Sequence, residues 1–137
     1  MMIERFKSLY QQLDAENVTQ LDTVYADNIC FVDPFHRVEG IDNLKNYFAR
    51  LYKNVQTIEF VFDRYQINQD SFFIQWTMRL QHPKLNKNEL FEVPGITYCR
   101  YADGKITFHR DYFDAGLMFY EKLPMIGRVV RWLKKQL

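Results

Sequence analysis

The chain has 137 residues, enough for one domain that buries most of its apolar surface. Its 18 Lys and Arg residues balance 17 Asp and Glu, so a formal charge of +1 gives no electrostatic case for a nucleic-acid partner. No apolar run approaches the length of a bilayer span, and the N-terminus lacks the basic-then-apolar pattern of a signal peptide. We therefore expect a soluble cytoplasmic protein.

Three amphipathic segments and one strand occupy the first part of the chain. Apolar side chains at helical spacing predict helices over residues 2–13, 18–25 and 41–51. Between the second and third helices, residues 28–33 have the composition of a strand, and Pro34 ends it. The N-terminal part is therefore mainly helical.

From residue 57 onward the apolar period changes from that of a helix to that of a strand. Alternation predicts strands over 57–63, 72–81 and 90–101, and an Asp103-Gly104 turn leads into a last strand over 106–114. Helices followed by a meander of strands are typical of an α+β fold. We expect a curved antiparallel sheet that wraps around the N-terminal helices as a cone with a ligand-sized interior.

His109 and Asp111 lie two residues apart on the last predicted strand, so both side chains point to one face. Titratable groups on an apolar inner face are costly, which favours a functional role. His109 can act as acid or base near neutral pH, although a core histidine bonded to a backbone carbonyl stays open. A metal site built from His109, Asp111 and Asp33 is a further alternative. No close-spaced ligand motif supports it, and we predict neither a metal nor a cofactor.

Two segments, Tyr25–Pro34 (YADNICFVDP) and Gly40–Leu44 (GIDNL), together with the order of elements, resemble the SnoaL-like part of the nuclear-transport-factor-2-like superfamily. That superfamily includes polyketide cyclases, ketosteroid isomerases and limonene-epoxide hydrolases. The resemblance implies one cystatin-like α+β barrel over residues 1–137. It implies a small, largely apolar ligand inside, and the same fold also hosts non-catalytic modules.

Asp33 matches the general-base aspartate of the ketosteroid isomerases in its position before Pro34. A carboxylate that faces an apolar cavity can remove a proton next to a carbonyl. The alternative is that Asp33 caps the turn before the following loop, since Asp-Pro commonly starts turns. The oxyanion-hole positions of those isomerases fall near Leu9 and Thr97, and neither residue supplies a comparable donor.

Asp111 falls where the limonene-epoxide hydrolases and SnoaL-like cyclases keep a catalytic aspartate, because residues 103–114 resemble their last strand. The Arg-x-Asp motif of the hydrolases is absent, and Trp76-Thr77-Met78 stands at its place, which argues against epoxide hydrolysis. The resemblance implies Asp111 as the acid/base centre, with Asp33 as its counterpart across the cavity. The alternative is a non-catalytic ligand-binding or interaction module.

The expected cone has an inner and an outer surface. A polyketide, terpenoid or sterol-like ring would suit aromatic inner walls, although such a face is more often plain core. The resemblance also implies a homodimer through the outer sheet face. Gln75, Thr77 and Arg79 are expected on that face. The side chains expected to contact the ligand are Tyr10, Phe31, Trp76, Met78, Val93, Thr97 and Phe113.

Residues 126–137 predict a basic amphipathic helix at the C-terminus. Val129, Trp132 and Leu133 lie broadly on one side, and Arg128 and Lys135 lie mainly on the other. We favour docking of this helix over its own domain. Contact with an anionic membrane surface is the alternative, since basic residues and Trp are typical of such helices.

Overall fold

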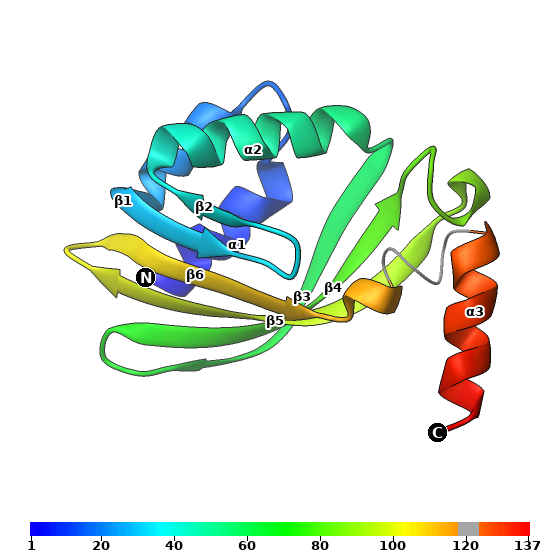
Figure 1. Cartoon of the computed structure of the whole chain (residues 1–137). Helices are drawn as coiled ribbons and strands as arrows, with labels where there is room; N and C mark the ends of the chain where they lie inside the picture. The colour runs from blue at the N-terminus through cyan, green and yellow to red at the C-terminus, as the bar shows by residue number, and fades with distance from the viewer. Residues whose placement is uncertain (118–123) are drawn as a thin grey trace.

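The computed structural model describes residues 1–117 and 124–137. One six-stranded sheet curves beneath the N-terminal helices, and the C-terminal helix stands at one end of it (Figure 1). In chain order, with η for 3-10 helices, the elements are α1 (Met2–Gln12), η1 (Val18–Thr23), β1 (Tyr25–Val32), β2 (Arg37–Glu39), α2 (Ile41–Asn54), β3 (Thr57–Ile67), β4 (Ser71–Gln81), η2 (Asn86–Asn88), β5 (Phe91–Ala102), β6 (Lys105–Phe113) and α3 (Pro124–Lys135).

The strand order of the sheet is β2-β1-β6-β5-β4-β3. Strands β3 to β6 form the predicted antiparallel meander, and β2 pairs antiparallel with β1. The α+β prediction with a curved sheet is confirmed, with one correction: β1 and β6 run parallel, so the sheet is mixed. This pairing places Phe31 of β1 beside His109 of β6.

Two local predictions differ from the structure. The helix predicted over 18–25 is the shorter 3-10 helix η1, because Tyr25 already belongs to β1 and pairs with Ile106 of β6. Strand β2 was not predicted, because three residues are too few for an alternation pattern to be detected. It forms through pairing with β1, in which Phe31 lies opposite Val38.

The core lies between the inner face of the sheet and helices α1 and α2. Alternation along β4 is complete: every second side chain from Phe72 to Leu80 is buried, whereas Phe73 and Gln75 are exposed. Thr77 and Arg79 are also on the outer side and are half-buried. The helices supply large apolar side chains to the same core. They are Ile3, Phe6, Leu9, Leu44 and Phe48.

Gly95 of β5 is required by the packing of Trp76 on β4. The two residues are register partners, and a Cβ added at Gly95 would lie 2.3 Å from Cη2 of the Trp76 ring. Since no real side-chain carbon tolerates that approach, only glycine allows the indole to lie flat against the neighbouring strand. Gly95 thus sets the position of an indole that lines an inner void of the protein.

None of the helices in residues 1–117 and 124–137 is both long and apolar enough to cross a membrane. Cys30 is half-buried and Cys99 is buried, and both thiols are free.

Candidate functional site

His109 and Asp111 form a hydrogen-bonded pair on the inner side of β6. The His109 Nε2 atom lies 2.7 Å from Asp111 Oδ1. The His109 side chain is 1% exposed, whereas that of Asp111 is 18% exposed. Because an ionised carboxylate only accepts hydrogen bonds, Nε2 carries the proton of this contact. The pair thus joins a fully buried ring to a carboxylate that reaches the edge of the core.

Two tyrosines continue the network on the other side of the His109 ring. The Tyr25 hydroxyl lies 2.9 Å from His109 Nδ1, and the Tyr10 hydroxyl lies 2.7 Å from that of Tyr25. Burial raises the pKa of both tyrosines well above the ordinary value, so both remain neutral hydroxyls. The thiol of Cys99 lies 3.5 Å from Nδ1, and burial likewise raises its pKa.

This hydroxyl chain suits either protonation state of His109. With a neutral ring, Tyr25 donates to Nδ1 and accepts from Tyr10; with a protonated ring, Nδ1 donates to Tyr25, which then donates to Tyr10. Once the ring gains its second proton, rotation of the Tyr25 and Tyr10 hydroxyl hydrogens completes the change, and no heavy atom moves.

Asp111 is also held from the β5 side. Thr97 donates its hydroxyl to Asp111 Oδ1 at 2.6 Å, and Trp76 Nε1 donates to Thr97 Oγ1 at 2.8 Å. Both hydrogen bonds to the Asp111 carboxylate thus use Oδ1. Among the described residues, none donates to Oδ2, which leaves one carboxylate oxygen for water or a ligand.

The void inside this network is very small, about 10 Å³. A space of this size holds about one water molecule. The ligand-sized interior expected from the sequence is therefore wrong for this structure, because aromatic side chains of α1 and β3 fill the cone. The lining side chains are Phe6, Tyr10, Phe60, Phe62, Trp76, Thr97, His109 and Asp111.

The side chains predicted to contact a ligand separate into three groups. Tyr10, Trp76 and Thr97 line the void, and Phe31 stacks on the His109 ring with centroids 4.4 Å apart. Phe113 lies outside the void and packs 6.1 Å from the Trp76 ring. Met78 and Val93 are buried in the core and do not belong to the lining.

Several participants were missed from the sequence. Phe60 and Phe62 had a usable signal, because their alternation with Glu59 and Asp63 already placed them on the inner face of β3. Tyr25 had none: it was assigned to a helix, and its contact with His109 depends on the parallel pairing of β1 with β6.

Asp33 is hydrogen-bonded in the manner of a turn cap. Its Oδ1 accepts from the backbone N–H groups of Phe35 and His36, each at 2.8 Å, and its Oδ2 accepts from the Tyr47 hydroxyl. Burial, followed by this hydrogen bond and the nearby charge of Asp33, raises the pKa of Tyr47. These contacts are those of the turn-capping alternative.

Asp33 and Asp111 nevertheless lie on one surface groove. Strands β1 and β6 are parallel neighbours, and Val32 of β1 is the register partner of Arg110 of β6. Asp33 and Asp111 are the residues that come next along the two strands. They are therefore side by side along the sheet, and not opposite each other across a cavity as expected. The groove encloses about 480 Å³. Its lining residues are Asp33, Pro34, Arg110, Asp111, Tyr112 and Phe113.

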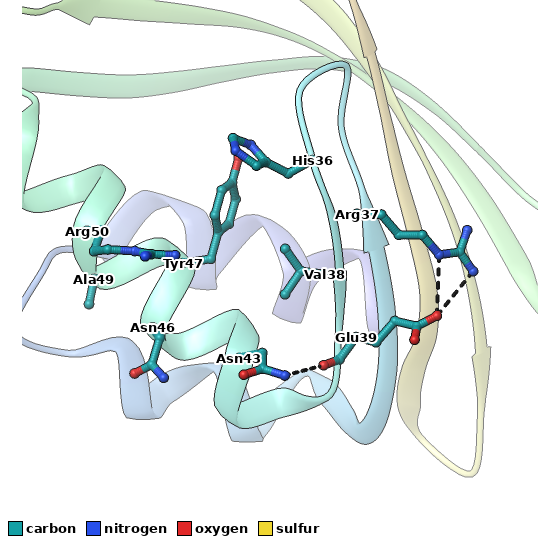
Figure 2. Close-up of a pocket in the computed structure, with 9 residues that line it drawn as sticks. All are labelled: His36, Arg37, Val38, Glu39, Asn43, Asn46, Tyr47, Ala49 and Arg50. Atoms are coloured by element: carbon teal, nitrogen blue, oxygen red, sulfur yellow. Dashed lines mark hydrogen bonds and ion pairs between the residues drawn. The ribbon is translucent and has the colours of Figure 1, made fainter.

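A second hollow, of about 680 Å³, lies between β2 and α2 (Figure 2). Its walls are polar: Arg37 forms a 3.2 Å ion pair with Glu39, and Asn43 donates to the Glu39 carbonyl at 2.9 Å. His36 lies against Tyr47, with ring centroids 5.2 Å apart, and is largely exposed. This hollow contains neither His109 nor Asp111.

In the described part of the chain, no three His, Cys, Asp or Glu side chains come close enough together to hold a metal ion. The His109–Asp111 pair lacks a third such ligand there. What the structure shows there is a hydrogen bond of 2.7 Å between an imidazole and a carboxylate.

A curved sheet packed against N-terminal helices is the arrangement found in solved structures of nuclear-transport-factor-2-like proteins. The model of the SnoaL-like domain matches residues 6–109, and the chain belongs to that family. The match ends at His109, so Asp111 lies just beyond it. No curated protein matches the chain significantly.

Solved structures support the same fold. A protein assigned to the SnoaL-like polyketide cyclases, from Jannaschia sp., is 17% identical, with a TM-score of 0.75 over 85% of this chain and 88% of that one. A protein of ketosteroid isomerase-like fold from Catenulispora acidiphila, in complex with trimethylamine, is 17% identical, with a TM-score of 0.77 over 90% and 93%. TerC, co-crystallised with polyporic acid, is 15% identical, with a TM-score of 0.71 over 88% and 96%. At these identities the likeness shows the fold alone.

Proposed function

We propose that the chain binds a small, largely apolar molecule at the groove beside Asp111 and transfers a proton to or from it through Asp111, with His109 as partner. One observation carries the proposal. Asp111 is held on Oδ1 by Thr97 and His109, while Oδ2 has no partner among the described residues and the side chain is 18% exposed. The groove of about 480 Å³ is within the usual size of ligand sites.

The proposed reaction is an isomerisation or cyclisation that begins next to a carbonyl group. Oδ2 of Asp111 takes a proton from the carbon beside the carbonyl, the electron pair of that C–H bond forms an enolate, and the proton returns at a different carbon. The Nε2–H of His109 and the hydroxyl of Thr97 hold the carboxylate in place. Asp33 contributes a second carboxylate to the same groove.

Two features favour a small, partly apolar ligand. Phe113 and Pro34 form apolar parts of the groove, beside Arg110 and the two aspartates. The structure of TerC with polyporic acid shows that a protein of this fold has been crystallised with a small organic compound. A ligand ring in the groove would place a reacting atom at Asp111, without entering the filled interior.

The alternative proposal is a binding module of the same fold without catalysis. It is favoured by the size of the inner void, about 10 Å³, and by the hydrogen bonds that occupy both oxygens of Asp33. On this alternative, Asp111 anchors a polar group of the ligand and no bond is broken.

The first experiment is native mass spectrometry of the purified protein, followed by identification of any bound organic compound. The recovered compound is then incubated with the wild-type chain and with Asp111→Asn. Asn has the shape of Asp and keeps an oxygen that can accept from Thr97 and His109, but it cannot take up a proton. Turnover should fall about 100-fold to 10,000-fold, with ligand affinity changed much less.

Asp103→Asn is the matched control, since the same chemical change falls on an exposed turn that tolerates asparagine at its positive φ of 53°. Full turnover by Asp111→Asn would disprove the assignment of Asp111. Tight binding without turnover in the wild-type chain would establish the non-catalytic alternative.

We also propose that the chain forms a homodimer through the outer sheet face. Besides Gln75, Thr77 and Arg79, that face carries large apolar side chains that are about half exposed. We expect Phe73→Asp to convert a dimer to a monomer in analytical ultracentrifugation. A wild-type chain that sediments as a monomer at all concentrations would exclude this proposal. The exposed apolar side chains are Val61, Phe73, Ile96 and Tyr112.

A further inference from the structure

Helix α3 separates apolar from basic side chains almost completely. At about 3.6 residues per turn, its apolar side chains occupy one continuous side and its basic ones the other. No acidic residue occurs between positions 124 and 137. The apolar side chains are Met125, Ile126, Val129, Val130, Trp132 and Leu133. The basic ones are Arg128, Arg131, Lys134 and Lys135.

The apolar side of α3 faces solvent. Met125 is 82% exposed, Val129 58%, Trp132 59% and Leu133 52%. The side that meets the rest of the chain is the opposite one, where Gly127 is buried and Lys134 Nζ lies 3.6 Å from Asp114 Oδ2. Figure 1 shows α3 beside the end of the sheet and not across its face. The docking of the apolar side on its own domain, favoured from the sequence, is thus not observed.

We propose that α3 binds the surface of an anionic lipid bilayer, lying in the plane of the interface with its apolar side inserted. Charge complementarity selects this occupant: the exposed Arg128 and Lys135 flank the apolar side, and α3 itself has no acidic residue, which suits a surface of lipid phosphates. Trp132, at one edge of the apolar side, has the side chain that favours the headgroup region. This proposal is independent of the proposed function of Asp111.

The basic residues stand where they can reach the lipid headgroups. Arg128 and Lys135 border the apolar side at the Trp132 edge, and Lys134 borders it at the Val130 edge. Their long side chains can extend back to the phosphates while the apolar side chains enter the acyl boundary. The ion pair of Lys134 with Asp114 is half exposed, so exchanging it for a lipid phosphate costs little.

The test is co-sedimentation of the full chain with vesicles of phosphatidylcholine alone and of phosphatidylcholine with phosphatidylglycerol. We expect binding to the anionic vesicles at low salt, and loss of most binding when salt is raised toward about 1 M, where charges are screened within about 3 Å. Vesicles of phosphatidylcholine alone should bind far less protein.

The two tryptophans of the chain supply a second measurement. Trp76 is 3% exposed and Trp132 is 59% exposed, so a blue shift of emission on vesicle binding reports Trp132. Trp132→Phe should keep most of the binding and lose the shift. If the shift persisted in Trp132→Phe, the inserted residue would be elsewhere and the proposal would fail.

Charge removal gives the quantitative test. The double variant Arg128→Gln/Lys135→Gln should weaken binding to anionic vesicles about 30-fold, at roughly a fivefold loss for each basic residue. The control Lys53→Gln/Lys84→Gln removes the same charge from exposed positions outside α3 and should leave binding unchanged.

Equal losses in both double variants would show that net charge, and not α3, attracts the protein to the vesicles. Absence of wild-type binding at low salt would also overturn the proposal. A concentration-dependent dimer that Trp132→Gln abolishes, without vesicle binding, would instead identify a second copy of the chain as the occupant of the apolar side.

Discussion

The network around His109 and helix α3 place similar side chains in opposite settings. Trp76 is 3% exposed, and its Nε1 donates to Thr97, whereas Trp132 is 59% exposed on a helix whose apolar side faces solvent. Both lie in segments of clear amphipathic pattern. An amphipathic pattern therefore predicts which side of a helix or strand is apolar, but not whether the rest of the chain covers that side.

The largest effect should come from truncating the two tryptophans in parallel. Trp76→Ala should lower the free energy of unfolding by about 3–5 kcal/mol, because it removes a buried ring and the partner of Thr97. Trp132→Ala should change it by no more than about 0.5 kcal/mol. Urea denaturation measures both. Comparable losses of unfolding free energy in the two variants would mean that the apolar side of α3 is packed against the protein in solution, which would contradict its exposure to solvent.

Gly95→Ala tests the packing of Trp76 from the opposite strand. The added methyl group would meet the indole at 2.3 Å, so the unfolding free energy should fall by about 1–3 kcal/mol as the ring is displaced. The smaller ring of Trp76→Phe should relieve part of this loss, and a double-mutant cycle should show coupling between the two sites. Additive losses would show that the indole does not lie over Gly95.

Tyr25→Phe tests the hydroxyl chain behind His109. The substitution removes the partner of the buried Tyr10 hydroxyl and leaves His109 Nδ1 with only the Cys99 thiol at 3.5 Å, which should cost about 1–3 kcal/mol. Tyr112→Phe removes a hydroxyl from a residue that is 53% exposed and should cost no more than about 0.5 kcal/mol. Equal effects of the two variants would contradict the buried network.

Alkaline pH should produce the smallest of these effects. Because burial raises the pKa of Tyr10 and Tyr25, the unfolded chain loses their protons above about pH 10 while the folded chain keeps them. The stability that the neutral hydroxyls contribute is complete below that pH and declines as pH rises. Each group should cost about 1.4 kcal/mol at about pH 11.

The variant Tyr25→Phe lacks one of these groups, so its unfolding free energy should fall less between about pH 9 and about pH 11 than that of the wild-type chain. Denaturant titrations at the two pH values measure the difference. An identical decline in both proteins would mean that Tyr25 ionises as readily in the folded chain as in the unfolded one.

Most of the fold was predictable because its signals are local. The alternation in residues 72–81 and 106–114 assigned each side chain to a face, and the structure confirms that His109 is buried on the inner side. The type and the end of helix η1 and the presence of the short strand β2 were not predicted, since each depends on pairing with β1 or on where β1 begins. The position of Asp33 relative to Asp111 was predicted wrongly, because it also depends on the parallel pairing of β1 with β6.

The sequence by itself determined the order of elements, the α+β class, the face of each strand and the basic amphipathic character of the last helix. All of these follow from spacing along the chain. Tertiary packing alone sets three further features: Asp33 and Asp111 are neighbours because β1 and β6 pair in parallel, aromatic rings leave a void of about 10 Å³, and the apolar side of α3 faces solvent. Strand neighbours and residual volume depend on the packing of segments distant in sequence, which a local period does not contain.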